Sequence, residues 1–291
     1  MILRKRPPRC GNEVRHQISL RHCVGALAIM LGAALVPTVV FALECPVRGE
    51  PSIPPPESVA TTDQPIAKGV NIDTYKRQLT EYQKKGYNSD IVAVMEKATR
   101  YVLDRALERA GEVKRPAVVL DIDETSLSNW DNIKADDYGF IEGGACPLQA
   151  KMACGFNDWI DMAIAPAIEP TLKFFNAIRA KEDAVSRKAI PNIAVFFITG
   201  RREQQRRATL WNLDRAGFKG WTGIATRPDE EHGTIVPFKS RERYNIAERY
   251  TILANIGDQD SDLEDLKELK DLKGPSAECT FKLPNPFYFI P

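Results

Sequence analysis

Within Val118-Val119-Leu120-Asp121-Ile122-Asp123-Glu124-Thr125, an apolar run changes abruptly to three carboxylates and a hydroxyl. This pattern predicts a buried strand that ends in a loop. In a parallel α/β sheet, ligands bind at that end of the strands. Asp121 and Asp123 would point to opposite faces of a continuing strand, so both can serve one site only if the chain bends between them. A surface turn is the alternative, because Asp is favoured in turns.

Strand-like and helical patterns alternate along the rest of the chain. The strand at 117–122 is followed by strand-like runs at 193–198, 223–225 and 251–256, with helical patterns at 203–216 and 240–249 between them. Two further helical patterns, at 74–85 and 89–110, come before the first strand and predict a helical hairpin. Alternating strands and helices predict an α/β fold, with a parallel Rossmann-like sheet and helices on both faces.

The first crossover is long enough to contain an insertion. Asp121 and Thr199 are 78 positions apart, whereas a βαβ crossover needs only about a dozen residues. We therefore expect a small cap at about 127–168, followed by a helix at 170–180. The aromatic residues of this cap could stack on an aromatic or nucleoside leaving group or simply pack the cap, and they are Trp130, Tyr138, Phe156 and Trp159.

The N-terminal region carries the features of an export signal. Six basic residues lie before an uncharged stretch from Val24 to Ala42 that ends in small residues. This order predicts a secretory signal peptide at 1–42, with an uncleaved membrane anchor as the alternative. A proline-rich segment at 43–65 predicts a linker, and 66–291 the folded domain. We expect a secreted or periplasmic protein with no membrane segment after cleavage.

The charge balance argues against nucleic acid as a partner. The whole chain has 40 Lys and Arg against 39 Asp and Glu. Residues 1–42 hold six of the basic and one of the acidic residues, so 34 and 38 remain after cleavage. A mildly acidic chain without a basic stripe has no electrostatic footprint for nucleic acid or an anionic membrane.

Four cysteines remain after the predicted cleavage, at positions 45, 146, 154 and 279. An even number in an exported chain indicates disulfides. Of the three possible pairings we favour Cys146–Cys154 with Cys45–Cys279. A zinc site is the alternative, but only His232 remains to join the cysteines and no Cys-x-x-Cys is present.

Polar residues also follow two other predicted strands. Thr199 and Gly200 end the second strand run before a helical pattern, an arrangement that offers donors to phosphate. Asp258 and Asp262 end the last strand run and share a helical face if a turn begins there. Carboxylates at strand ends suit a hard cation such as Mg²⁺.

Four motifs in this order resemble those of the haloacid dehalogenase-like superfamily. They are Asp121-Ile-Asp123-Glu-Thr, a hydrophobic residue before Thr199-Gly-Arg, Lys239-Ser-x-x-Arg243, and Gly257-Asp258-Gln-x-Ser-Asp262-Leu. More narrowly, they resemble the secreted acid phosphatases of the class B/class C and plant acid phosphatase family. Leu283-Pro-Asn-Pro is similar to the ending of that family. The resemblance covers roughly residues 72–290.

The resemblance implies an exported, Mg²⁺-dependent acid phosphatase that hydrolyses small phosphomonoesters through an aspartyl-phosphate. It implies that Asp121 is the nucleophile, Asp123 the general acid/base, and Lys239 the cation of the third motif. It places Thr199, Gly200 and Lys239 at the phosphate, and metal binding at Asp121, Asp123, Asp258 and Asp262. A 5′-nucleotidase, a phosphotransferase, and a non-catalytic storage or binding protein of the same fold are the alternatives.

Two further expectations concern charge. For this chemistry Asp121 must be ionised while Asp123 is protonated, so we expect the pKa of Asp123 to lie above that of Asp121. We expect Arg201, Arg202 and Arg243 to be surface charges.

Overall fold

The computed structural model describes residues 45–53, 71–144 and 154–290. Its sheet has the strand order β1-β6-β5-β2-β3-β4, and all neighbouring strands are parallel. The strands are β1 (Val47–Arg48), β2 (Arg115–Leu120), β3 (Ala194–Arg202), β4 (Gly223–Arg227), β5 (Tyr250–Gly257) and β6 (Cys279–Lys282). The carboxyl ends of all strands therefore lie at one edge of the sheet. The predicted parallel α/β fold is confirmed.

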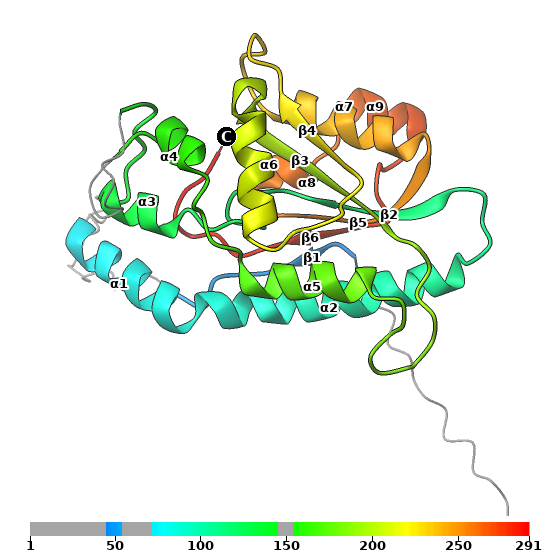
Figure 1. The fold of residues 1–291 in the computed structure, drawn as a ribbon. Helices are drawn as coiled ribbons and strands as arrows, with labels where there is room; N and C mark the ends of the chain where they lie inside the picture. The colour runs from blue at the N-terminus through cyan, green and yellow to red at the C-terminus, as the bar shows by residue number, and fades with distance from the viewer. Residues whose placement is uncertain (1–44, 54–70, 145–153, 291) are drawn as a thin grey trace, which may run out of the picture. The chain divides into compact units, whose positions relative to one another are not determined.

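Helices pack on both faces of the sheet because both faces are apolar. In β2, Val118 and Leu120 belong to the larger core, whereas Val119 belongs to a smaller core that also contains Phe238. Consecutive strand residues point to opposite faces, so this division separates the two sides of the sheet. The helices α2 (Tyr87–Glu108) and α5 (Glu169–Arg179) lie side by side on one face, and α7 (Val236–Ala247) covers the other (Figure 1).

The predicted helical hairpin is formed by α1 (Ile72–Lys85) and α2. Helix α1 begins two residues before the predicted start, because the side chain of Asn71 caps it by accepting a hydrogen bond from the backbone N–H of Thr74. Tyr82 is buried in the core, and its hydroxyl donates to Asp90 at 2.9 Å. The tyrosines of this hairpin therefore lie in the core or pack against it.

The long crossover between β2 and β3 contains the insertion. Its described part holds α3 (Trp130–Ala135) and α4 (Phe156–Met162) before α5. Cys154 is buried and disulfide-bonded, while its predicted partner Cys146 lies outside the described residues. The remaining short helical elements follow β3 and β5, and they are η1 (Glu203–Gln205), α6 (Arg206–Arg215), α8 (Asp260–Leu263) and α9 (Lys267–Lys273).

Two strands of the sheet are absent from the sequence-based prediction. Val47 and Arg48 form β1, which pairs with Phe281 and Lys282 of β6. The predicted disulfide Cys45–Cys279 is confirmed and joins the segment just before β1 to the first residue of β6, with 5.4 Å between the Cα atoms. The first part of the predicted linker therefore belongs to the sheet. The sequence does not predict strand β1, because a two-residue strand has no detectable periodicity and the prolines around it are typical of a linker.

The predicted signal peptide at 1–42 and the predicted linker from residue 54 to 65 lie outside the described residues. Within the described ranges, no helix combines the length and the apolar character needed to cross a bilayer.

Candidate active site

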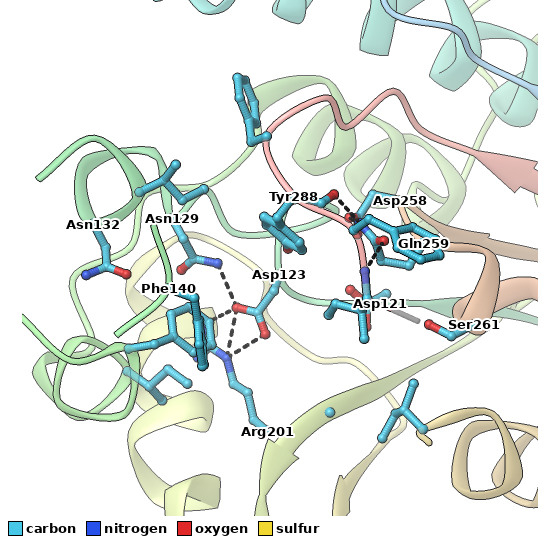
Figure 2. A pocket seen from close by; sticks show the side chains of 18 of the residues that line it. Asp121, Asp123, Asn129, Asn132, Phe140, Arg201, Asp258, Gln259, Ser261 and Tyr288 are labelled. Atoms are coloured by element: carbon cyan, nitrogen blue, oxygen red, sulfur yellow. Dashed lines mark hydrogen bonds and ion pairs between the residues drawn. The ribbon is translucent and has the colours of Figure 1, made fainter. Parts of the chain in front are cut away.

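The ends of β2, β3 and β5 meet at a cavity of about 580 Å³ (Figure 2). It is lined by six of the seven residues predicted for the site, namely Asp121, Asp123, Gly200, Lys239, Asp258 and Asp262. Thr199, the seventh, is fully buried and does not line the cavity. Its hydroxyl accepts a hydrogen bond from the backbone N–H of Arg201 at 3.2 Å.

The chain bends after β2, and this brings both aspartates to one cavity. The carbonyl oxygen of Ile122 accepts hydrogen bonds from the backbone N–H groups of Ser126 and Leu127, both at 2.8 Å. Within this turn Glu124 has φ of 51° and is fully buried. Its carboxylate accepts from the backbone N–H of Asn129 at 2.9 Å. Burial raises the pKa of Glu124 to about 8.

Three buried carboxylates lie beside one lysine. Oxygen atoms of Asp121, Asp258 and Asp262 all lie within 4.8 Å of one another. Lys239 comes from α7 and donates from Nζ to Asp121 Oδ1 at 2.6 Å and also to Asp262. Burial alone would lower the pKa of Lys239, but the charges of Asp121 and Asp262 outweigh it and raise the pKa. One ammonium therefore balances at most one of the three negative charges.

The unbalanced charge appears in the pKa values of the aspartates. Burial and the charge of Asp262 raise the pKa of Asp121 well above its usual value, and the same two causes raise that of Asp258 to about 7. A divalent cation would relieve this repulsion, and carboxylate oxygens are the ligands that hard cations take. The three-carboxylate cluster thus fits a divalent metal ion.

Asp258 is held in place by three donors from separate parts of the chain. Thr125 donates to its Oδ1 at 2.9 Å, and Gln259 and Asn285 donate to its Oδ2 at 2.6 and 2.7 Å. These contacts were not predicted. The Leu283-Pro-Asn-Pro motif was the available signal for Asn285, because two prolines around one amide mark a fixed loop conformation.

Asp262 is fixed from both sides of its turn. Its carboxylate accepts from the backbone N–H of Gln259 at 2.9 Å. Its carbonyl oxygen accepts from Asn255 at 2.8 Å and from Arg243 at 2.6 Å. At Gly257 an added Cβ would lie 2.4 Å from the side chain of Asp262, so only glycine allows this close approach.

The prediction that Arg243 is a surface charge was wrong. Only 1% of Arg243 is exposed, and its guanidinium also pairs with Asp265 at 3.2 Å. It binds the chain around Asp262 through backbone carbonyls, and these contacts offset the cost of burying its charge.

Arg201 is also buried, contrary to the prediction. Strand β3 continues beyond Thr199, and Arg201 reaches Asp123, with Nη2 2.7 Å from Oδ1 and Nε 3.1 Å from both carboxylate oxygens (Figure 2). Asn129 donates to the same carboxylate at 2.9 Å. Burial alone would raise the pKa of Asp123, but the charge and hydrogen bonds of Arg201 outweigh it and lower the pKa.

Two expectations for Asp123 therefore differ from the structure. Without a cation, the pKa of Asp123 is lowered and that of Asp121 is raised, the reverse of the expected order. The carboxylate of Asp123 faces Arg201 and is not a member of the three-carboxylate cluster. Arg201 lowers the pKa of Asp123 and holds its carboxylate, because it supplies a cation from the chain itself, whereas burial and the charge of Asp262 raise the pKa of Asp121.

Aromatic side chains form one part of the cavity wall. Tyr138 and Phe156 of the predicted cap line the cavity, together with Phe140 and the C-terminal residues Phe287, Tyr288 and Phe289. The two predicted tryptophans serve packing instead. Trp130 contacts the rings of Tyr138 and Phe287, and buried Trp159 donates from Nε1 to Asn129 at 2.9 Å.

Comparisons with known proteins agree with this geometry. Residues 58–291 match the family described as HAD superfamily, subfamily IIIB (acid phosphatase). Acid phosphatase 1 of Solanum lycopersicum is 30% identical over 244 residues, which cover 80% of this chain and 84% of that protein. The Stem 28 kDa glycoprotein of Glycine max is 30% identical over 207 residues, 70% of each chain. Vegetative storage protein 2 of Arabidopsis thaliana is 33% identical over 100 residues, 34% of each chain.

A solved structure shares the fold. The class C acid phosphatase from Bacillus anthracis superposes with a TM-score of 0.51 and 24% identity, over 74% of this chain and 86% of that one. The family match spans the strand ends, the cavity and all four motifs. The chain is therefore a phosphoric monoester hydrolase that belongs to subfamily IIIB, the acid phosphatases, of the HAD superfamily.

Proposed function

We propose that the protein is an exported, Mg²⁺-dependent acid phosphatase that hydrolyses small phosphomonoesters through an aspartyl-phosphate on Asp121. The observation that carries the proposal is the position of Asp121. It lines the cavity, and its Oδ1 lies 2.6 Å from Lys239 Nζ, within a three-carboxylate cluster that fits a cation.

The roles of the side chains follow from their partners. The carboxylate of Asp121 attacks phosphorus, and the bond to the ester oxygen breaks. Asp123 gives a proton to the departing oxygen and then takes one from the water that attacks the aspartyl-phosphate. Lys239 and the backbone at Gly200 face the same cavity and offset charge on the phosphoryl oxygens, while buried Thr199 orients the end of β3.

Asp121, Asp258 and Asp262 are the residues that would hold Mg²⁺. When bound, this ion would favour the ionised form of Asp121 and neutralise charge on the phosphate. Asp123 we assign to proton transfer rather than to the metal through its side chain, because Arg201 and Asn129 occupy its carboxylate oxygens. Export is supported by the basic and apolar N-terminal sequence and by the Cys45–Cys279 disulfide.

Acid-quench trapping of labelled phosphate tests the chemistry. Wild-type protein should retain label after a brief reaction with a phosphomonoester and Mg²⁺, and Asp121→Asn should retain none. Asp123→Asn should retain label when the leaving group is good, because attack then needs no proton donor, but it should lose that label slowly. Retention of label on Asp121→Asn would show that the nucleophile is another residue.

The storage or binding role of some relatives is the second candidate. It is supported by the printed name of vegetative storage protein 2, whose similarity covers 34% of this chain. No phosphate release from any monoester by folded wild-type protein in Mg²⁺ would support it. Release measured beside transfer to an alcohol acceptor separates a hydrolase from a phosphotransferase, and comparison of 5′-nucleotides with other monoesters tests for a 5′-nucleotidase.

A further inference from the structure

Two arginines line the cavity on the side away from β5. Arg202 is the last residue of β3 and Arg227 the last residue of β4, and the two are register partners. Both line the cavity that also contains Asp121 and Lys239. Because β2, β3 and β4 are consecutive neighbours and strands lie about 4.8 Å apart, Arg227 belongs to a strand roughly 10 Å from that of Asp121.

Neither guanidinium forms an ion pair within the described part of the chain. Arg202 donates from Nη1 to the carbonyl oxygens of Pro228 and Glu231, at 3.0 and 2.5 Å. Arg227 donates from Nη2 to the carbonyl oxygen of Gly233 at 2.9 Å. Two positive charges therefore lie beside each other, with neutral carbonyl partners and no carboxylate bound to either.

The carboxylate that could balance these charges is bound elsewhere. Glu231 lies in the loop that both arginines contact, but its Oε2 accepts from Arg241 at 2.7 Å. Arg241 is not a cavity residue. Glu231 thus contributes its carbonyl oxygen to Arg202 and its ion pair to a third arginine, while its charge offsets only part of the lowering of the pKa of Arg227.

Arg227 has a donor without an acceptor. Only 8% of the residue is exposed, and its Nε is buried with no hydrogen-bond partner among the described residues. Burial lowers the pKa of Arg227, and the charge of Arg202 lowers it further. A buried guanidinium charge without a carboxylate partner is costly, and an anion in the cavity that the two arginines line would balance it.

We propose that Arg202 and Arg227 form a second anion-binding subsite, which takes a second phosphate or carboxylate of the substrate. This inference rests on the proposed function and specifies its substrate class. The preferred substrates are small phosphomonoesters with a second anionic group several bonds from the phosphate that is cleaved. Arginine suits such a group, because its planar fork donates two parallel hydrogen bonds to phosphate or carboxylate.

A purely structural role makes a different prediction. If the two arginines only tether the loop at 228–234, their replacement should lower the melting temperature without changing the preference between singly and doubly anionic ligands. The tethering contacts use one nitrogen of each guanidinium and, among the described residues, leave both positive charges without a carboxylate partner.

Equilibrium binding of non-hydrolysable ligands tests the subsite. Calorimetric titrations of the full chain, with Mg²⁺ in excess, would compare straight-chain alkane bisphosphonates from propane to hexane with monophosphonates of the same length. Phosphonocarboxylates of each length would distinguish a second phosphate from a carboxylate. We expect the ligand with two anionic groups of the best-fitting length to bind at least about tenfold more tightly than the monophosphonate of the same length, as one charge-assisted contact allows.

Three variants make the test specific. Arg202→Gln and Arg227→Gln should each reduce the preference for the second anion by about 10- to 100-fold. The matched control is Arg207→Gln, which removes the same charge from an exposed position outside the cavity and should leave the preference intact. Arg202 is only partly buried, so Arg202→Gln still tests the inference if Arg227→Gln does not fold.

Equal binding of singly and doubly anionic ligands at every length would overturn the inference. A preference that survives in both arginine variants, or that is lost equally in Arg207→Gln, would also overturn it. Failure of the proposed function has a different signature. In that case no phosphomonoester would be hydrolysed, while the binding preference and its dependence on Arg202 would remain.

Discussion

Replacement of Arg201 by glutamine should destabilise the fold, because the buried carboxylate of Asp123 would lose its cation. Arg201 and Asp123 form an ion pair between β3 and the turn after β2. Their side chains are 1% and 17% exposed. Arg201→Gln removes the cation and leaves the carboxylate in place. Asn129 then remains as its only described side-chain donor, at 2.9 Å.

The magnitude follows from burial. Breaking a buried ion pair by removal of one partner costs about 3–5 kcal/mol, and the residual exposure of Asp123 places this pair near ~3 kcal/mol. For a domain of roughly this size, about 3 kcal/mol lowers the melting temperature by ~6–12 °C. The same change at a surface pair would cost about 0–1 kcal/mol.

The sign of the pH dependence identifies the carboxylate as the cause. In the wild type, Arg201 lowers the pKa of Asp123 below its usual value. The ionised carboxylate therefore stabilises the fold above the unfolded-state pKa of about 3.9, and this contribution is lost as the pH falls through the lower folded-state pKa. Without Arg201, burial dominates and raises the folded-state pKa, so the same carboxylate destabilises the fold increasingly as the pH rises. The destabilisation by Arg201→Gln should therefore grow as the pH rises above the unfolded-state pKa of about 3.9.

Urea denaturation across this pH range would measure the effect in Arg201→Gln, Asp123→Asn and the double variant. The double variant should recover most of the loss at neutral pH, with a coupling free energy of about 3 kcal/mol. Arg207→Gln is the charge-matched control. A destabilisation by Arg201→Gln that is the same at every pH, or that persists in the Asp123→Asn background, would refute the reasoning.

Three further outcomes are expected. Asn285→Ala removes the 2.7 Å hydrogen bond to Asp258, so the Mg²⁺ concentration for half-maximal activity should rise by about 10- to 100-fold. An unchanged Mg²⁺ dependence would contradict the supporting role of Asn285. Cys45→Ser opens a disulfide that closes a loop with a sequence separation of 234, so urea denaturation should show a loss of about 2–5 kcal/mol, and equal stability would contradict this. Since the folded-state pKa of Asp258 is raised to about 7, metal-free protein should lose stability as the pH rises from about 4 to about 7. Mg²⁺ should restore the melting temperature at pH 7. An unchanged melting temperature on addition of Mg²⁺ would contradict the cation site.

The sequence predicted the sheet centre and the location of the site because both depend on local signals. Each central strand is an apolar run that ends in polar residues, and parallel strands bring such ends to one edge. The bend between Asp121 and Asp123 was predicted from side-chain alternation alone, and the hydrogen bonds to the carbonyl of Ile122 confirm it.

The sheet edge could not be predicted for a physical reason. Strand β1 has two residues and β6 has four, and both are stabilised by partners far away in sequence. Short strands carry no periodicity, and the proline content around β1 is typical of linkers. The favoured disulfide Cys45–Cys279 implies that these two segments are close, but a disulfide alone does not specify that they pair as strands.

The two buried arginines were missed because burial of a charge depends on its partners. Composition alone favours an exposed position for arginine. Arg201 can be buried because it pairs with the carboxylate of Asp123, 78 positions away. Arg243 can be buried because it pairs with Asp265 and donates to the carbonyl oxygen of Asp262. Neither set of partners is visible in the residues beside the arginine in sequence.

The distribution of these cations explains why the pKa values of Asp121 and Asp123 shift in opposite directions. Asp123 has Arg201 as its own cation, and its pKa is lowered without any bound ion. Asp121 shares Lys239 with Asp262, and its pKa is raised. The chain alone therefore lowers the pKa of Asp123 and raises that of Asp121, the opposite of the order that the proposed attack on phosphorus requires. A divalent cation at the three-carboxylate cluster would favour the ionised form of Asp121, and the phosphate dianion of the substrate would favour protonation of Asp123. In the proposed mechanism both ligands are therefore needed to bring the two aspartates to their working protonation states, so chelation should abolish phosphoenzyme formation as completely as Asp121→Asn does.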